Sequence, residues 1–131
     1  MKLNNIKKQA GLTLIEVTLV IAVLLGLISV LFIGVSAYKE GSNRSKCILN
    51  ISNVQKAVRS YQNLYEKAVG DACVQDTLAG SGKLLETVPT CPSSGTYTWL
   101  GTIPAVGTAY LTCSKSAVAD GDHKPTTTAG W

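Results

Sequence analysis

The sequence predicts an α+β fold, in which one long N-terminal helix packs on a small antiparallel β-hairpin. Three observations predict it: an unbroken apolar run near the N-terminus, a helical repeat of apolar residues after it, and a C-terminal part rich in Gly, Ser, Thr and Pro with two strand-like segments. We therefore expect a basic leader over 1–11, an apolar helix over 12–38, an amphipathic continuation over 39–69 and a small β-rich domain over 70–131.

The apolar run extends from Val17 to Tyr38 without one charged side chain. A helix of that length crosses the roughly 30 Å hydrocarbon core of a bilayer, so we expect a single transmembrane segment. Gly26 and Gly34 allow a neighbouring helix to approach closely. These glycines and the Gly41-Ser42-Asn43 stretch are the weak points of the helix, because glycine costs about 1 kcal/mol relative to alanine.

The helix is predicted to continue well beyond the apolar run. Apolar side chains recur there at steps of three and four residues, which places them on one helix face: Ile48, Ile51, Val54, Val58, Tyr61 and Tyr65. Polar residues fill the remaining surface: Asn53, Gln55, Lys56, Arg59, Ser60 and Asn63. Gly70 followed by Asp71 is a helix stop signal, so we expect one helix from about Leu12 to about Ala68.

Two segments in the C-terminal part have the β-branched and aromatic content of strands, namely 97–100 and 109–113. Gly101, Pro104 and Gly107 lie between them and supply turn residues. We expect an antiparallel hairpin, with room for one more strand. It would pack on the helix face that carries Ile51, Val54, Val58 and Tyr61, and the polar end from Asp120 to Trp131 would be loop.

All four cysteines follow the apolar run: Cys47, Cys73, Cys91 and Cys113. An even number in a small membrane-anchored domain favours an oxidising compartment and disulfide bonds over a metal site. No Cys-x-x-Cys spacing occurs, and the one histidine, His123, is expected in a surface loop without a catalytic role. We therefore expect no metal, no cofactor and no enzymatic activity.

The cysteine spacing restricts the possible disulfide pairs. Cys91 and Cys113 flank the predicted hairpin, which favours a bond across its base. An unbroken helix from Cys47 to Ala68 would separate these two residues by about 32 Å, and the chain from there to Cys73 reaches back about 18 Å at most. That helix excludes a Cys47–Cys73 bond, so these two cysteines remain unassigned, and Cys47 can instead accept a C-terminal cysteine.

The charge of the chain argues against strong binding of a polyanion. The formal net charge is +4, and three of the basic residues, Lys2, Lys7 and Lys8, lie in the leader, so removal of the leader leaves +1. Asp120-Gly121-Asp122 offers two carboxylates as weak calcium candidates, Asp120 and Asp122. A calcium ion takes 6–8 oxygen ligands, so a solvated turn is the favoured interpretation.

The leader differs from an ordinary secretory signal, in which small residues at the cleavage site follow the apolar stretch. Here the small pair Ala10-Gly11 precedes it, so cleavage there leaves the apolar segment in place as an anchor. The alternative is an uncleaved signal-anchor helix. A basic leader favours the cytoplasm, and the cysteines favour an extracytoplasmic C-terminal domain.

The string Gly11-Leu12-Thr13-Leu14-Ile15-Glu16-Val17, followed by about twenty apolar residues, resembles the class III signal of type IV pilins and type II secretion pseudopilins. The resemblance implies cleavage after Gly11 by a prepilin peptidase and N-methylation of the new N-terminal residue, here Leu12 where these families usually have Phe. It also implies a single-pass protein of the cytoplasmic membrane that joins related subunits, with the assembly machinery, in an extracytoplasmic filament. The apolar run lacks the helix-kinking proline of many type IV pilins. The segment from Cys91 to Tyr97, with the later Cys113 and His123, also resembles a pattern in some pseudopilin-like proteins and supports the fold.

Glu16 is the sharpest functional candidate, because a carboxylate at the head of an apolar run, among Leu14, Ile15 and Val17, is costly. After cleavage the amine of Leu12 is a new positive charge, and the resemblance implies that Glu16 pairs with the amine of a neighbouring subunit during assembly. The alternative is that Glu16 extends to the membrane surface at small cost.

The expected function is that of a structural subunit. Two rival functions remain: a DNA-uptake pilin, against which the low net charge argues, and a monomeric signal-anchored binding protein outside the cytoplasm. The filament alternatives left open are an adhesive pilus, a motility fibre, a secretion pseudopilus and a competence structure.

Overall fold

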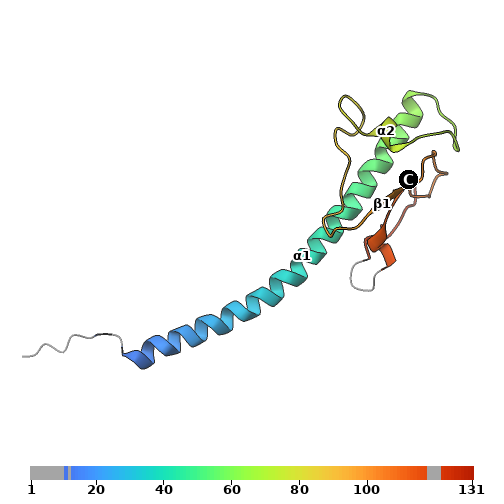
Figure 1. The fold of residues 1–131 in the computed structure, drawn as a ribbon. Helices are drawn as coiled ribbons and strands as arrows, with labels where there is room; N and C mark the ends of the chain where they lie inside the picture. The colour runs from blue at the N-terminus through green and yellow to red at the C-terminus, as the bar shows by residue number, and fades with distance from the viewer. Residues whose placement is uncertain (1–10, 12, 118–121) are drawn as a thin grey trace, which may run out of the picture. The chain divides into compact units, whose positions relative to one another are not determined.

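The computed structural model describes residue 11, residues 13–117 and residues 122–131. Its elements in chain order are the helix α1 (Leu14–Leu64), the short helix α2 (Gln75–Leu78), the strands β1 (Tyr97–Trp99) and β2 (Leu111–Cys113), and the 3-10 helix η1 (Ser114–Ala117) (Figure 1). The chain divides into two compact units, and the boundary in the sequence lies between Ala37 and Tyr38. Each unit is described by itself below.

The prediction of one long helix is confirmed, with slightly shorter bounds. The helix α1 ends at Leu64 because Glu66 adopts a left-handed backbone conformation, with φ of 50°. The N–H of Lys67 then bonds back to the carbonyl oxygen of Gln62 at 2.9 Å, which is the bond of a Schellman motif. The helix therefore closes before the predicted stop signal at Gly70.

In the first unit, the apolar part of α1 is exposed along its whole length, from Leu14 to Ala37. By length and composition it includes one span that is apolar enough to cross a membrane. Its hydroxyl groups are satisfied within the helix: Thr18, Ser29 and Ser36 each donate to a backbone carbonyl oxygen of the preceding turn, at 2.7 to 3.0 Å. This part of the helix therefore adds no unpaired hydroxyl to an apolar environment.

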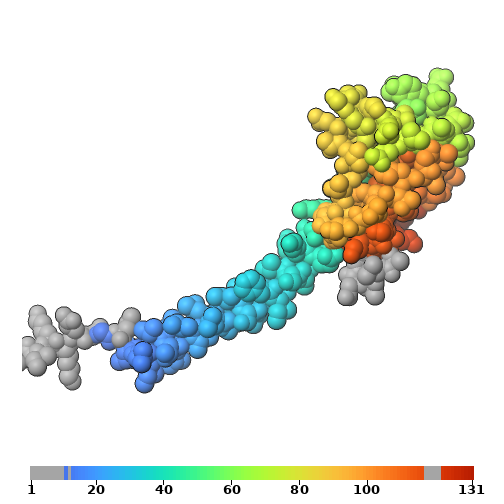
Figure 2. All heavy atoms as spheres, viewed as in Figure 1, coloured from blue at the N-terminus to red at the C-terminus, as the bar shows by residue number. Residues whose placement is uncertain are grey.

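In the second unit, a small core forms on the predicted face of α1. Ile51, Val54 and Val58 are buried, and Tyr61 packs against them at the edge. Figure 2 shows the chain from α2 to β2, in yellow to orange, packed directly on this part of α1, in green. The residues that complete the core are Cys47, Cys73, Leu78, Cys91, Ile103, Tyr110, Leu111 and Cys113. Full burial of one such apolar side chain contributes about 1.5–3 kcal/mol.

The predicted hairpin is also confirmed, although its strands are shorter than expected. The strands β1 and β2 pair antiparallel, with Tyr97 opposite Cys113 and Trp99 opposite Leu111. Within the described residues the sheet has these two strands. The sequence interpretation did not foresee α2 or η1, because helices of four residues carry too little periodicity to recognise.

One surface prediction on α1 is wrong. Gln55 is only 3% exposed, because its side-chain oxygen accepts a hydrogen bond from the N–H of Tyr110 at 2.8 Å and its amide nitrogen donates to the carbonyl oxygen of Thr108 at 3.2 Å. A polar side chain is tolerated in a core when its hydrogen bonds are made.

Candidate functional site

The predicted processing and assembly residues lie at the start of α1. Gly11 is exposed, and Leu12 lies outside the described residues. Glu16 is exposed in the first turn, and it exchanges two hydrogen bonds with Thr13: the N–H of Thr13 donates to its carboxylate at 3.0 Å, and its own N–H donates to the Thr13 hydroxyl at 3.3 Å. This reciprocal pair is a capping box.

The capping role of Glu16 was missed at the level of sequence, although its signal was present. A Thr followed three residues later by Glu, immediately before an apolar run, marks a helix start. The same carboxylate that the resemblance assigns to assembly therefore also satisfies a backbone donor in the single chain.

The structure also brings together three of the cysteines and His123, a group that the sequence interpretation did not predict. The sulfur atoms of Cys47, Cys91 and Cys113 and a ring nitrogen of His123 all lie within 4.8 Å of one another, and all four residues are buried. Cys47 comes from α1, Cys91 from the loop before β1, Cys113 from the end of β2, and His123 from the segment after η1. We call these four residues the Cys3His cluster.

The predicted position of His123 in a surface loop is wrong. The residue is fully buried, and its two ring nitrogens face different groups. Nδ1 lies 3.5 Å from the sulfur of Cys91, and Nε2 lies 3.3 Å from a carboxylate oxygen of Glu40. Glu40 also accepts a hydrogen bond from the hydroxyl of Ser93 at 3.1 Å.

The predicted partners Cys91 and Cys113 are neighbours, with their sulfur atoms 3.7 Å apart. Neither is bonded to the other, and all four cysteines are free thiols in this structure. Cys47 lies beside this pair. Cys73 is buried outside the cluster. Its own backbone carbonyl oxygen accepts a hydrogen bond from the Tyr110 hydroxyl.

The surroundings shift the pKa values of the three thiols in the cluster in different directions. Burial alone raises the pKa of Cys91, but the backbone N–H groups of Ser93 and Gly95 and the thiols of Cys113 and Cys47 outweigh it and lower the pKa to about 7. Burial raises the pKa of Cys47 to about 12 and also raises the pKa of Cys113. Three sulfur atoms this close do not all ionise without a cation among them.

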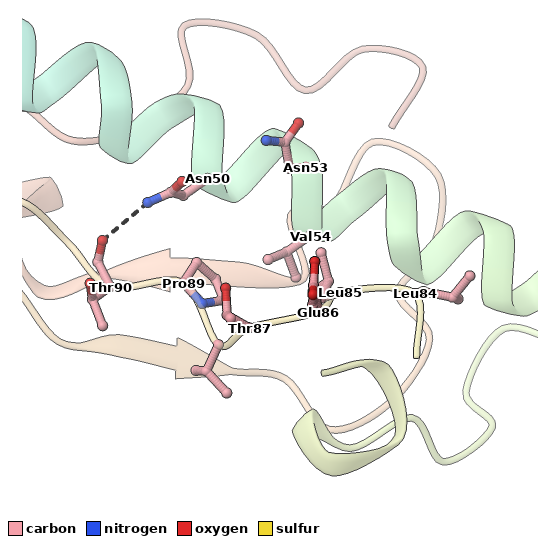
Figure 3. Close-up of a pocket in the computed structure, with 10 residues that line it drawn as sticks. Asn50, Asn53, Val54, Leu84, Leu85, Glu86, Thr87, Pro89 and Thr90 are labelled. Atoms are coloured by element: carbon pink, nitrogen blue, oxygen red, sulfur yellow. Dashed lines mark hydrogen bonds between the residues drawn. The ribbon is translucent and has the colours of Figure 1, made fainter. Parts of the chain in front are cut away.

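Hydrogen bonds from the hairpin hold the helix side of the cluster. The hydroxyl of Tyr97 donates to the sulfur of Cys47 at 3.2 Å. The amide of Asn50 donates to the Tyr97 oxygen at 3.3 Å and to the carbonyl oxygen of Thr90 at 3.1 Å, the bond drawn in Figure 3. Asn50 therefore connects α1 both to the chain just before Cys91 and to β1.

A groove lies between α1 and the segment 84–90, as Figure 3 shows. Amide, hydroxyl and apolar side chains line it, with one carboxylate, Glu86. This lining lacks the convergent charged or nucleophilic groups on which catalysis depends. Of the weak calcium candidates, Asp122 is exposed and Asp120 lies outside the described residues.

Comparison of the chain with known protein families, with curated proteins and with solved structures finds no match.

Proposed function

We propose that the chain is a prepilin-like structural subunit, which is cleaved after Gly11 and assembled through its N-terminal helix into a type IV pilus or a type II secretion pseudopilus. The observation that carries the proposal is the start of α1, where one carboxylate, Glu16, stands at the head of a helix segment that is apolar and exposed on every side. The signal-like string that resembles the pilin families covers the same residues.

The exposure of this segment supports a role in assembly. A helix that is apolar all round is stable in lipid or among other apolar helices, and not in water. Among the described residues, side chains added at Gly26 or Gly34 would meet no atom within 4 Å, so these glycines have no packing role there. Close approach of a neighbouring helix is a role that they can have.

The charge of Glu16 supports a specific partner. Its capping bond requires an acceptor oxygen but no negative charge, because glutamine also serves at this position of a capping box. A charged group near apolar surface is costly when it is unpaired. After cleavage, the positive amine of Leu12 in a neighbouring subunit can pair with the Glu16 carboxylate. This pairing would set the stagger between subunits.

Two substitutions separate the cap from the charge. Glu16→Gln keeps an acceptor for the Thr13 N–H and removes the charge, whereas Thr13→Ala removes the hydroxyl acceptor and keeps the charge. Both variants and the wild type would be expressed in the native host, and leader removal, N-methylation and filament content would be measured by mass spectrometry and by shearing of surface filaments.

We expect Glu16→Gln to be cleaved but largely missing from the filament fraction. Thr13→Ala should still assemble, because losing a cap costs only about 0.5–2 kcal/mol of helix stability. A wild-type chain that still begins at Met1 in its native membrane would overturn the proposal. Normal assembly of Glu16→Gln would overturn the pairing of Glu16 with the neighbouring amine. A wild-type chain that is cleaved but absent from the filament fraction would instead favour a monomeric anchored protein.

A further inference from the structure

We propose that Cys47, Cys91, Cys113 and His123 bind one zinc ion, which acts as a structural centre of the second unit. This inference is independent of the proposed role in a filament, because it concerns only residues of Tyr38–Trp131. Three cysteines and one histidine form a common donor set of closed, structural zinc sites.

Two distances in the Cys3His cluster match those of a tetrahedral zinc site, and all four donor atoms lie within 4.8 Å of one another. With Zn–S near 2.3 Å and Zn–N near 2.0–2.1 Å, tetrahedral angles place two sulfur ligands about 3.8 Å apart and a sulfur and a nitrogen about 3.6 Å apart. The sulfur atoms of Cys91 and Cys113 are 3.7 Å apart, and the sulfur of Cys91 is 3.5 Å from Nδ1 of His123. A disulfide requires sulfur atoms about 2.0 Å apart.

The histidine is oriented as a zinc ligand. Its Nδ1 lies 3.5 Å from the sulfur of Cys91, and its Nε2 lies 3.3 Å from the carboxylate of Glu40, which also accepts a hydrogen bond from the hydroxyl of Ser93. Metal-binding histidines usually donate their second ring N–H to a carboxylate or carbonyl oxygen, which fixes the tautomer and orients the ring. Glu40 has that position here and would be a positioning residue.

The cysteines have donors aimed at their sulfur atoms. The Tyr97 hydroxyl donates to the sulfur of Cys47 at 3.2 Å. The backbone N–H groups of Ser93 and Gly95 favour a lower pKa of Cys91, and the N–H of Lys115 acts in the same direction on the pKa of Cys113. Such donors stabilise the thiolate, which is the form that binds a metal. The sulfur of Cys47 therefore has a hydrogen-bond partner that suits the bound state.

The backbone at Gly95 gives the sulfur atoms their space. A Cβ at this position would lie 2.8 Å from the sulfur of Cys113 and 3.0 Å from that of Cys91. The two sulfur atoms that approach residue 95 therefore require a glycine there.

Binding needs no oxidant. One Zn²⁺ replaces the protons of the three thiols, which leave as H⁺, and neutral His123 contributes a lone pair from Nδ1. The resulting centre has a net charge of −1, which the surrounding N–H and O–H donors offset. Disulfide formation between Cys91 and Cys113 would instead consume two of the ligands, so the two states exclude each other.

The test begins with the wild-type full chain, without a histidine tag, purified in detergent from membranes without chelator. Elemental analysis should find one zinc per chain, and mass spectrometry under denaturing, non-reducing conditions should find four free thiols. Replacement of zinc by Co²⁺ should produce the sulfur-to-cobalt charge-transfer absorption and the visible bands of a tetrahedral site. These measurements do not depend on a variant that folds.

Substitutions then assign the ligands. Cys47→Ser, Cys91→Ser, Cys113→Ser and His123→Ala should each lower zinc affinity by at least tenfold in competition with a chelator. Cys73→Ser is the matched control, because Cys73 is equally buried in the same unit but lies outside the cluster, and it should keep the zinc. Glu40→Gln should lower the affinity by about 10–100-fold, as loss of an orienting partner does.

A Cys91–Cys113 disulfide in protein from the native membrane, with no bound zinc, would overturn the inference. So would a metal content that Cys73→Ser reduces as much as Cys91→Ser, because the metal would then not be held by the cluster.

Discussion

The side-chain oxygen of Gln55 accepts a hydrogen bond from the backbone N–H of Tyr110, 2.8 Å away, in the buried core of the second unit. The same amide donates to the carbonyl oxygen of Thr108. One polar side chain of α1 thus satisfies two backbone groups of the segment that leads into β2, and it fixes the position of that segment on the helix.

Replacing Gln55 by Leu should destabilise the second unit by about 1–3 kcal/mol, because the N–H of Tyr110 is left buried without an acceptor. The free energy of unfolding can be measured by denaturant titration, with tryptophan fluorescence as the signal. Trp99 packs edge-to-face on Tyr110, with ring centroids 5.9 Å apart, and reports on this region. The exposed Asn63→Ala is the control and should change the stability by less than about 0.5 kcal/mol. Equal effects of the two substitutions would contradict the assigned role of Gln55.

Gly95→Ala should cost about 1–3 kcal/mol, because the added methyl group overlaps the sulfur atoms of Cys113 and Cys91. The measurement is the same titration, with and without added zinc, and the zinc affinity should fall as well. The neighbouring Ser94→Gly is the control, and it should not destabilise the protein. Ser94 has a φ of 59°, so glycine relieves a left-handed strain of about 1–2 kcal/mol against a loss of chain entropy of about 0.5–1 kcal/mol. A stable Gly95→Ala protein that keeps its zinc would show that the close approach is not required.

Arg59→Lys should loosen the C-terminal segment and cost about 1–3 kcal/mol. The guanidinium of Arg59 donates to the backbone oxygens of Pro104, Ala105 and Trp131, at 2.9 to 3.2 Å, and one ammonium group does not reach all three positions. Hydrogen exchange should quicken in residues 128–131. Lys56→Arg, an exposed substitution on the same helix, keeps the charge and should leave the exchange unchanged.

Stability should fall in alkaline solution through Tyr110. Burial, and then the nearby thiol of Cys73, raise the pKa of Tyr110 from 10.0 to about 12. Between these values the unfolded chain has lost the phenolic proton and the folded chain has kept it. The contribution of Tyr110 to the free energy of unfolding is therefore complete below pH 10. It is lost as the pH rises toward 12, by at most about 1.4 kcal/mol per pH unit.

The measurement compares Tyr110 with Tyr110→Phe, both in a Cys73→Ser background. The background matters because burial also raises the pKa of Cys73, which adds a loss in the same direction. The Phe variant should be less stable at neutral pH, since it lacks the hydrogen bond to the carbonyl oxygen of Cys73, but its stability should depend less on pH above 10. Parallel pH profiles of the two proteins would contradict this account.

The long helix and the hairpin were predictable because their signals are local. Apolar spacing at three and four residues identifies the buried face around Ile51, Val54 and Val58 without any knowledge of what covers it. The burial of Gln55 was not predictable in this way. Its partners are in the segment before β2, more than fifty residues along the chain, and only the fold brings them together.

The Cys3His cluster escaped prediction for the same reason. Zinc sites are recognised in sequences by closely spaced ligand pairs, and here each ligand comes from a different segment. A disulfide between Cys91 and Cys113 was predicted, and the structure places their sulfur atoms 3.7 Å apart without a bond. An isolated histidine in a polar segment carries no local sign of burial. The capping box at Thr13 and Glu16, by contrast, was readable and was passed over.

Glu40 and Cys47 attach two turns of α1 to the rest of the second unit. They are seven residues apart, so they lie on the same side of the helix, two turns and about 10 Å from each other. The loop before β1 and the segment of His123 hold both ends, through the contacts of Glu40 with Ser93 and His123 and through the sulfur of Cys47. Gly41, a weak point of the helix, lies between these two residues. If α1 is stretched or partly unwound during assembly, the break should therefore fall before Glu40, and the second unit should travel as an intact body.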